Sequence, residues 1–374
     1  MPYADPAHDP DLQPLAHFRG TRLDPVPADR KRAIERAAQA LREELLAAEP
    51  VAYLRSFDLV HLPYPTRYAL RDACRVPWPF VQMVNRLIVV QFRGDQGRVR
   101  TLLVSPTDVE GSKATPFFRR LSQRMGPLAG VLEPLVAPQS TTVEAALAVC
   151  GIHPHEVDYL TYDHLHTQDV RRWLGSPTVP GVFPNAKLLV MRQEWQSVLG
   201  LLPPQRHWYC PDGIAGVDRQ RVVLLDGDTR LGQGVALVAT PGHTAGNHSI
   251  VLRTPEGLLV TSENGVSADC YAPLQSRIPG LAAYARATGM EVVLNGNTLE
   301  GALDQYLSMI LEKTLAGPAL RDPDFPAVMP SSELDATWLA PGLRPTLFHG
   351  ELCFGAPLAA HLPASAQPWV SRVA

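Results

Sequence analysis

Short runs of apolar and β-branched residues constrain the fold of this chain more than any other feature of its sequence. The runs are residues 85–92, 98–105, 157–160, 186–191, 221–225, 235–239, 249–252 and 258–261. Their length and composition predict β-strands, and the glycine-bounded turn at 94–97 joins the first two as a hairpin. Strands in such groups, separated by helices, predict two sheets with helices packed outside them.

Helical spacing of apolar residues predicts the helices between and before these strands. The clearest pattern covers residues 27–49, where apolar side chains recur every three or four positions at Ile34, Ala38, Leu41 and Leu45. Shorter helical patterns cover residues 142–151, 192–199 and 301–316. The long amphipathic helix is expected to pack on the surface of the domain or against a second copy, so a homodimer through this helix is one alternative.

Length and composition set the broad class of the protein. A chain of 374 residues exceeds the usual size of one domain. We therefore expect either one large domain with an extension or two domains. Hydrophobic residues make up 45% of the chain and the net charge is −3, without a run of Lys or Arg. This composition argues against a nucleic-acid partner, which needs a clustered basic face.

Five widely spaced cysteines form neither a disulfide framework nor a metal-binding pair, which favours a reducing compartment. Residues 1–30 contain no apolar run like the core of a signal peptide. No stretch approaches the roughly 20 apolar residues that cross a bilayer. We therefore expect a cytoplasmic protein without a membrane partner.

Two histidine-containing segments follow predicted strands. His164 and His166 come directly after the strand at 157–160, two positions apart, so their side chains point the same way if the backbone is extended. Two imidazoles so placed can bind one cation, and Asp169 can add a ligand or take up a proton. The second segment, Thr-Pro-Gly-His at 240–243, places His243 in a tight turn after the strand at 235–239.

Two further residues follow later strands. Glu263 comes after the strand at 258–261, at the carboxyl end where sheet proteins often place chemistry. His349 follows a short apolar run. Each feature alone is weak evidence for a functional site, because polar side chains at strand ends and in turns often only face solvent.

Together, in this order, the segments resemble the metallo-β-lactamase superfamily. That family has an HxHxDH motif, a third histidine in a TPGHTPG-like turn, a bridging acid after a further strand and a late histidine. The stretch TPGHTAGNHS at 240–249 is the most specific match, and the resemblance covers roughly residues 80–350. It implies an α/β fold, an αββα sandwich of two mixed β-sheets flanked by helices, here with an N-terminal helical extension. The extension would cover residues 1–80, with one amphipathic helix, and the catalytic domain residues 81–374.

The resemblance also implies a ligand set. His164, His166 and His243 match the three histidines of the first metal site, Glu263 matches the bridging acid, and His349 is the candidate late histidine.

The sequence departs from the family motif at 168–169 and at 163. Gln168 and Asp169 stand where the family has Asp and His, and glutamine is a poor ligand for a transition metal. The second site is therefore either rebuilt from Asp169, Glu263 and His349 or empty. Asp163 replaces a small hydroxyl residue; it either orients an imidazole or lies in solvent.

The favoured function is hydrolysis of an ester, lactone or amide of a small molecule by a metal-activated water, with zinc as one or two ions. Asp169 and Glu263 are the candidate catalytic residues, and the distant Tyr271 has a doubtful role. The alternative is a mononuclear or dinuclear non-haem iron oxygenase, because histidines and a carboxylate also suit iron. A non-catalytic member of the family is the third hypothesis. The loops around 106–140, 200–215 and 265–280 are expected to form the substrate pocket.

Overall fold

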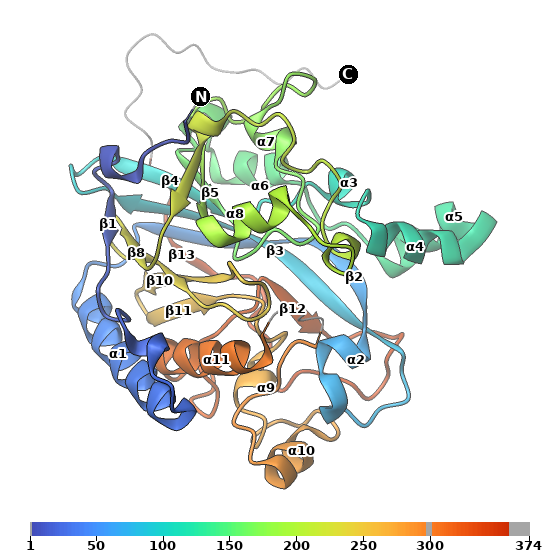
Figure 1. Ribbon diagram of the computed structural model, residues 1–374. Helices are drawn as coiled ribbons and strands as arrows, with labels where there is room; N and C mark the ends of the chain where they lie inside the picture. The colour runs from blue at the N-terminus through green and yellow to red at the C-terminus, as the bar shows by residue number, and fades with distance from the viewer. Residues whose placement is uncertain (1, 297–300, 359–374) are drawn as a thin grey trace.

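The computed structural model describes residues 2–296 and 301–358. Two β-sheets lie face to face, and helices cover the outer face of each (Figure 1). The αββα architecture expected from the strand pattern is therefore confirmed.

The larger sheet has eight strands and is mixed. Its order is β13 (Cys353–Gly355), β2 (Tyr53–Pro65), β3 (Phe80–Arg93), β4 (Val99–Val104), β5 (Tyr159–Thr161), β6 (Lys187–Met191) and β7 (Val222–Leu225), with β12 (Ser332–Asp335) also pairing with β3. Strands β3 and β4 form the predicted antiparallel hairpin, whereas β4 to β7 run parallel. Helices α6 (Val143–Cys150) and α8 (Arg192–Leu199) pack on the outer face of the parallel half.

The smaller sheet has five strands, which pair antiparallel. Their order is β1 (Leu12–Pro14), β8 (Thr229–Leu231), β9 (Val235–Ala239), β10 (His248–Thr254) and β11 (Gly257–Thr261). Helices α1 (Pro27–Ala47) and α11 (Ala302–Ala316) pack against each other and cover its outer face (Figure 1). A third apolar cluster lies between the sheets and includes Leu54, Val90, Leu237 and Ile250, all essentially unexposed. Apolar burial on both faces explains why the strands are nearly continuous apolar runs.

The residues predicted as an N-terminal extension take part in the sandwich. Strand β1 joins the smaller sheet and β2 joins the larger sheet. Helix α1 begins at the predicted residue 27 and ends two residues before the predicted end at 49. The division at residue 80 and a homodimer through the extension stay predictions. Residue 1 and residues 359–374, the outer ends of the two predicted regions, lie outside the described residues.

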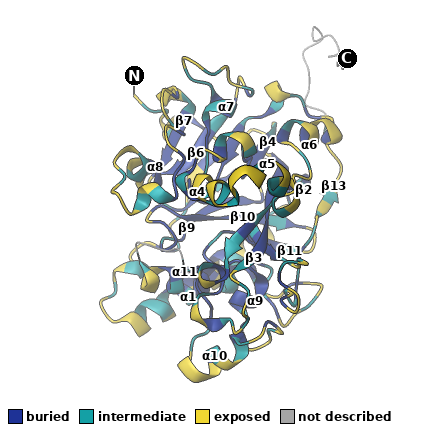
Figure 2. Ribbon diagram, turned by 90° about the vertical axis from the view of Figure 1, so that its right-hand side faces the viewer, coloured by how far each residue is buried: buried dark blue, intermediate teal, exposed yellow. Residues whose placement is uncertain are grey.

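The segment between β4 and α6 contains helices that the sequence patterns did not assign. These are α3 (Val109–Ser112), α4 (Pro116–Met125) and α5 (Ala129–Val136), with a short 3-10 turn at Gly126–Leu128. Helices α4 and α5 project from one side of the sandwich (Figure 1), and much of their surface is exposed (Figure 2). Within the described ranges, none of the helices has the length and apolarity that crossing a membrane requires.

Candidate metal centre

Three histidines from two sheets meet at one edge of the sandwich. His164 and His166 lie in the loop after β5 of the larger sheet, and His243 lies in the turn between β9 and β10 of the smaller sheet. Their ring centroids are 4.5 to 5.0 Å apart, and one nitrogen from each ring lies within 4.8 Å of the other two. All three side chains are buried. The sequence prediction that these histidines converge agrees with this geometry.

The backbone around His166 is held in an uncommon conformation. Thr167 has a φ of +62°, which a β-branched residue rarely adopts, and its N–H donates to the carbonyl of Trp208 at 2.8 Å. His166 forms a β-bridge with Tyr209. Such strain persists where the surrounding contacts fix the chain, and it is often found at functional sites.

The turn that carries His243 is fixed by close packing and hydrogen bonds. Gly242 has a φ of +143°, and a Cβ there would lie 2.2 Å from backbone atoms of Gln305 in α11, so only glycine fits. The N–H of His243 donates to Asn264 Oδ1 at 3.2 Å. The residue after Glu263 therefore holds the third histidine in place.

The fully buried carboxylate of Glu194, in α8, connects the two histidine loops. Its Oε1 accepts the N–H of Leu165, between the first two histidines, at 2.8 Å and the hydroxyl of Tyr209 at 3.1 Å. Its Oε2 accepts the hydroxyl of Thr244, next to His243, at 2.6 Å. Glu194 was not among the residues predicted from the sequence, because no motif distinguishes it from the charged and polar residues beside it.

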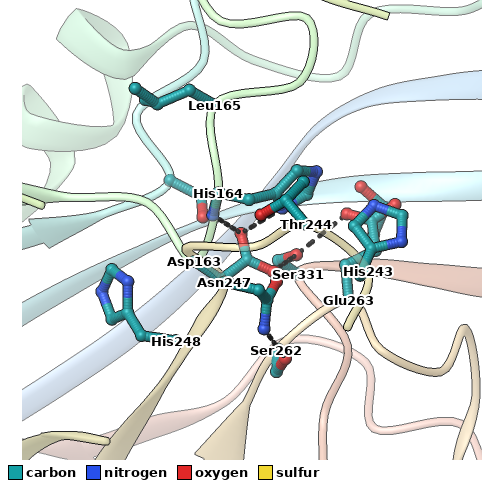
Figure 3. A network of polar contacts seen from close by, with 12 residues as sticks. Asp163, His164, Leu165, His243, Thr244, Asn247, His248, Ser262, Glu263 and Ser331 are labelled. Carbon is teal, nitrogen blue, oxygen red and sulfur yellow. Dashed lines mark hydrogen bonds and ion pairs between the residues drawn. The ribbon is translucent and has the colours of Figure 1, made fainter. Parts of the chain in front are cut away.

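Two carboxylates lie beside His164 and share one hydroxyl group (Figure 3). Asp163 Oδ1 is 3.1 Å from His164 Nδ1. The hydroxyl oxygen of Ser331 is 2.9 Å from Asp163 Oδ2 and 3.0 Å from Glu263 Oε2. A hydroxyl has one hydrogen and donates to one of these carboxylates at a time. The two carboxylates therefore compete for the hydroxyl of Ser331, and a proton or a cation between them would relieve the repulsion of their charges.

Burial and charge divide the histidines into two kinds. Burial lowers the pKa of His166 and of His243 well below the ordinary value, so both are neutral imidazoles at neutral pH. Burial also acts against a charge on His164, but Asp163 outweighs it and raises the pKa of His164 to about 9. A neutral imidazole is the form that binds a metal ion.

The residues present fit a cation. Both ring nitrogens of His243 and Nδ1 of His166 are buried without a hydrogen-bond partner among the described residues. Unpaired buried polar atoms are costly, and one nitrogen from each of the three rings lies within 4.8 Å of the other two, so a shared ligand would satisfy them. Asp163, His164 and Glu263 form a second overlapping group with ligand atoms within 4.8 Å of one another. Imidazole and carboxylate ligands suit zinc and related divalent ions.

The structure does not bring Asp169 and His349 to this cluster. Asp169 accepts two N–H groups of Arg171, at Nε (2.9 Å) and at the backbone (3.0 Å), because Arg171 lies only two residues further on. His349 Nδ1 pairs with the buried Glu333 at 2.8 Å, and His349 lines a separate cavity of about 60 Å³. Ser331 occupies the place beside Glu263 that the sequence analysis gave to His349. The ligand roles of Asp169 and His349 stay predictions without a geometric support.

Two other predicted residues are placed clearly. Gln168 lines the cavity described next, and its Oε1 is buried without a hydrogen-bond partner in the part of the chain that the structure describes. Tyr271 is fully buried, and its hydroxyl donates to Glu312 at 2.7 Å, so it has a place in the core behind the site.

The histidine cluster lies at the end of a cavity of about 670 Å³. Its walls come mainly from β2, β3 and the segment 105–139, as predicted for the loop around 106–140, and Trp208 contributes from the loop around 200–215. No residue of 265–280 is among the lining residues that the structure describes. The volume is typical of a site for a small molecule, and most of the lining is apolar.

No protein-family model matches the chain. Among solved structures, the chain is similar to AidC, a dizinc quorum-quenching lactonase, with 12% identity over 83% of this chain and 97% of that chain, at a TM-score of 0.50. It is also similar to a quorum-quenching N-acyl homoserine lactone lactonase (15% identity, 65% and 90% covered, TM-score 0.44). A third similar structure is AbOPH, a hydrolase in the β-lactamase superfamily (14% identity, 83% and 100% covered, TM-score 0.40). The chain therefore has the metallo-β-lactamase fold, which confirms at the level of the fold the resemblance carried by its histidine motifs.

Proposed function

We propose that this chain is a metal-dependent hydrolase that cleaves an ester, a lactone or an amide of a small molecule. One observation carries the proposal: three buried histidines, each with a ring nitrogen within 4.8 Å of the other two, line a largely apolar cavity. The similarity to lactonases and hydrolases supports it, and their names state what those proteins do.

His164, His166 and His243 would hold the cation, and Glu263 would approach it from the side of the smaller sheet. A divalent ion bound there lowers the pKa of water to about 7 and polarises a carbonyl oxygen. Zinc is the ion we propose. Since neither Asp169 nor His349 joins the cluster, we propose one tightly held ion per chain.

The residues around the ion would position the reactants. The apolar walls of the cavity would bind the acyl part of the substrate and keep bulk water away from the histidines. Glu263 lines the cavity and would accept a proton from the attacking water, with its Oε2 held by Ser331. The hydroxyl of Ser331 would keep Glu263 and Asp163 in fixed orientations.

The test is a substrate screen with defined metal and defined atmosphere. Zinc-loaded protein should cleave members of a panel of esters, lactones and amides with oxygen excluded. Glu263→Gln should lower kcat by about 100-fold or more, as is typical for loss of a proton-transfer group. The exposed Glu256 provides the matched control, and Glu256→Gln should leave kcat unchanged.

The same screen with ferrous iron separates the hydrolase from the oxygenase. Turnover that requires both iron and dissolved oxygen, followed with an oxygen electrode, would overturn the hydrolase and leave the metal-binding residues in place.

A further inference from the structure

Helices α4 and α5 and the residues before them form a projecting arm, defined here as residues 113–136. One side of this arm lines the cavity, through apolar side chains that include Phe117, Leu121, Met125 and Val136. The other side faces solvent (Figure 2). The arm is therefore a wall of the cavity on one side and a solvent-exposed surface on the other.

The free surface of the arm is apolar at its tip. Leu128, Val131 and Leu135 have exposed fractions of 61%, 68% and 61%. They are three of the twelve large apolar side chains that are exposed among the described residues, and they lie within eight positions of one another. Clustered exposure of this kind marks an interaction surface, whereas scattered single residues do not.

The surface next to the tip is basic. Arg120 and Arg124 on α4 are exposed, and neither has an ion-pair partner within residues 2–296 and 301–358. Arg119 is also exposed, but it lines the cavity. The arm carries four basic side chains and one acidic side chain, Glu133, in a chain whose net charge is −3. Glu133 accepts the hydroxyl of Ser122, inside the arm. The outer face therefore combines apolar side chains with unpaired positive charge.

We propose that this arm docks the protein onto an anionic lipid surface and that the site takes its ester or lactone substrate from that surface. Apolar side chains beside arginines are the combination that binds reversibly to a lipid interface, where the former enter the acyl boundary and the latter meet the headgroups. A symmetric dimer through the arm is disfavoured, because a two-fold interface uses the same patch of both copies, and the one acidic side chain of the arm, Glu133, already accepts the hydroxyl of Ser122. The part of the proposal that concerns substrate rests on the proposed function.

This proposal departs from the expectation of no membrane partner. That expectation rested on the lack of a spanning segment, and docking through an arm needs none. An apolar cavity whose wall faces the lipid would admit an amphiphilic substrate without exposing its acyl chain to water. A lipid-soluble ester or lactone is the substrate class that suits an apolar cavity beside a lipid-binding surface.

Co-sedimentation with vesicles tests the docking. The full chain, stripped of metal with a chelator, is mixed with phosphatidylcholine vesicles with or without phosphatidylglycerol. We expect pelleting with the anionic vesicles that falls as salt is added. The double variant Arg120→Gln/Arg124→Gln should lower the partition coefficient by about 25-fold, from roughly fivefold per basic residue. Val131→Ser/Leu135→Ser should also lower it.

Matched controls come from exposed residues elsewhere on the chain. Arg286→Gln and Leu320→Ser change an exposed arginine and an exposed leucine outside the arm and should pellet like the unchanged protein. All these side chains are exposed, and circular dichroism would verify that the variants fold. Equal pelleting of arm variants and controls, or no pelleting of the unchanged chain, would overturn the docking.

Three further outcomes separate lipid docking, self-association and hydrolysis. A stable dimer that dissociates in Val131→Ser/Leu135→Ser, measured by analytical ultracentrifugation, would assign the arm to a second copy and overturn lipid docking. Pelleting without cleavage of any ester or lactone would leave the docking standing and count against the proposed function. Cleavage of soluble substrates without pelleting would support the proposed function and overturn the docking.

Discussion

Removal of the Glu194 side chain should weaken metal binding as well as stability. The carboxylate accepts hydrogen bonds from Leu165, Tyr209 and Thr244, and it thereby joins the loop of His164 and His166 to the turn of His243. Its side chain is fully buried, so water does not replace it freely. The residue therefore acts through its neighbours, as a positioning residue for the three histidines.

The magnitude follows from the three donors. Glu194→Ala leaves each of them without an acceptor, at about 1 to 3 kcal/mol for each buried group. Because partial collapse and water entry recover some of this loss, we expect the free energy of unfolding to fall by about 3 to 5 kcal/mol. Glu194→Gln keeps one acceptor oxygen, and the hydroxyl of Thr244 can turn to accept from the new amide, so the loss should be about 1 to 2 kcal/mol.

Zinc affinity shows whether Glu194 positions the three histidines or only stabilises the fold. In competition with a fluorescent chelator, Glu194→Ala should bind zinc about 10- to 100-fold more weakly, as is typical when a partner of a ligand is removed. Glu194→Gln should recover most of this affinity. The exposed Gln193 lies on the same helix, and Gln193→Ala should match the unchanged protein in both measurements.

A double-variant cycle sharpens this test. Because Thr244 and Glu194 form one hydrogen bond, Thr244→Val and Glu194→Ala should weaken zinc binding less in combination than the sum of their separate effects. If Glu194→Ala lowers the free energy of unfolding while zinc affinity stays the same, the carboxylate only supports the fold and the reasoning is refuted.

Three further predictions follow from the site. His166→Ala should remove the metal that co-purifies with the chain, measured by mass spectrometry, whereas the exposed His155→Ala should retain it; equal metal content in both would contradict the proposed ligand set. Gln168→Asp with Asp169→His should raise zinc occupancy from near one ion per chain towards two, and two tightly bound ions in the unchanged protein would show that a second site already works. Gly246→Ala should lower the free energy of unfolding by at least about 3 kcal/mol in urea titration, because its Cβ would lie 2.1 Å from a backbone nitrogen of α8; a smaller loss would mean that α8 moves easily.

The pattern of strands and helices was predictable where each element is apolar and regular. The hairpin of β3 and β4, the strands of the smaller sheet after residue 230 and helices α1, α8 and α11 follow the patterns closely. Strand β2 was harder to place, because a bulge between Asp58 and Val60 interrupts its alternation. Strand β12 has the sequence SELD, which lacks the apolar residues that would predict a buried strand. Its Glu333 is buried because it pairs with Arg86.

The convergence of the histidines and of Glu263 was predictable, whereas Glu194 and Ser331 were not. His164 and His243 follow strands in motifs with recognisable spacing, so sequence order sufficed to bring them together. His349 also follows an apolar run, but its partner is Glu333, which is 16 positions earlier in the chain and has no motif. Ser331 has no pattern that distinguishes it from other serines. Its role as the shared donor is visible only once three separate loops are placed in space.

The geometry of the centre depends on how the two sheets pack. Two of the proposed ligands come from the larger sheet, and His243 and Glu263 come from the smaller one, so sliding of one sheet over the other would separate the nitrogens that converge now. Glu194 connects the two loops across this boundary, from a helix that packs on the larger sheet. A cation held by both sheets stabilises the folded state by RT ln(1 + [L]/Kd), since the unfolded chain lacks the site. Metal binding and sheet packing therefore reinforce each other, and a variant that loosens either should lower both the thermal midpoint and the zinc affinity.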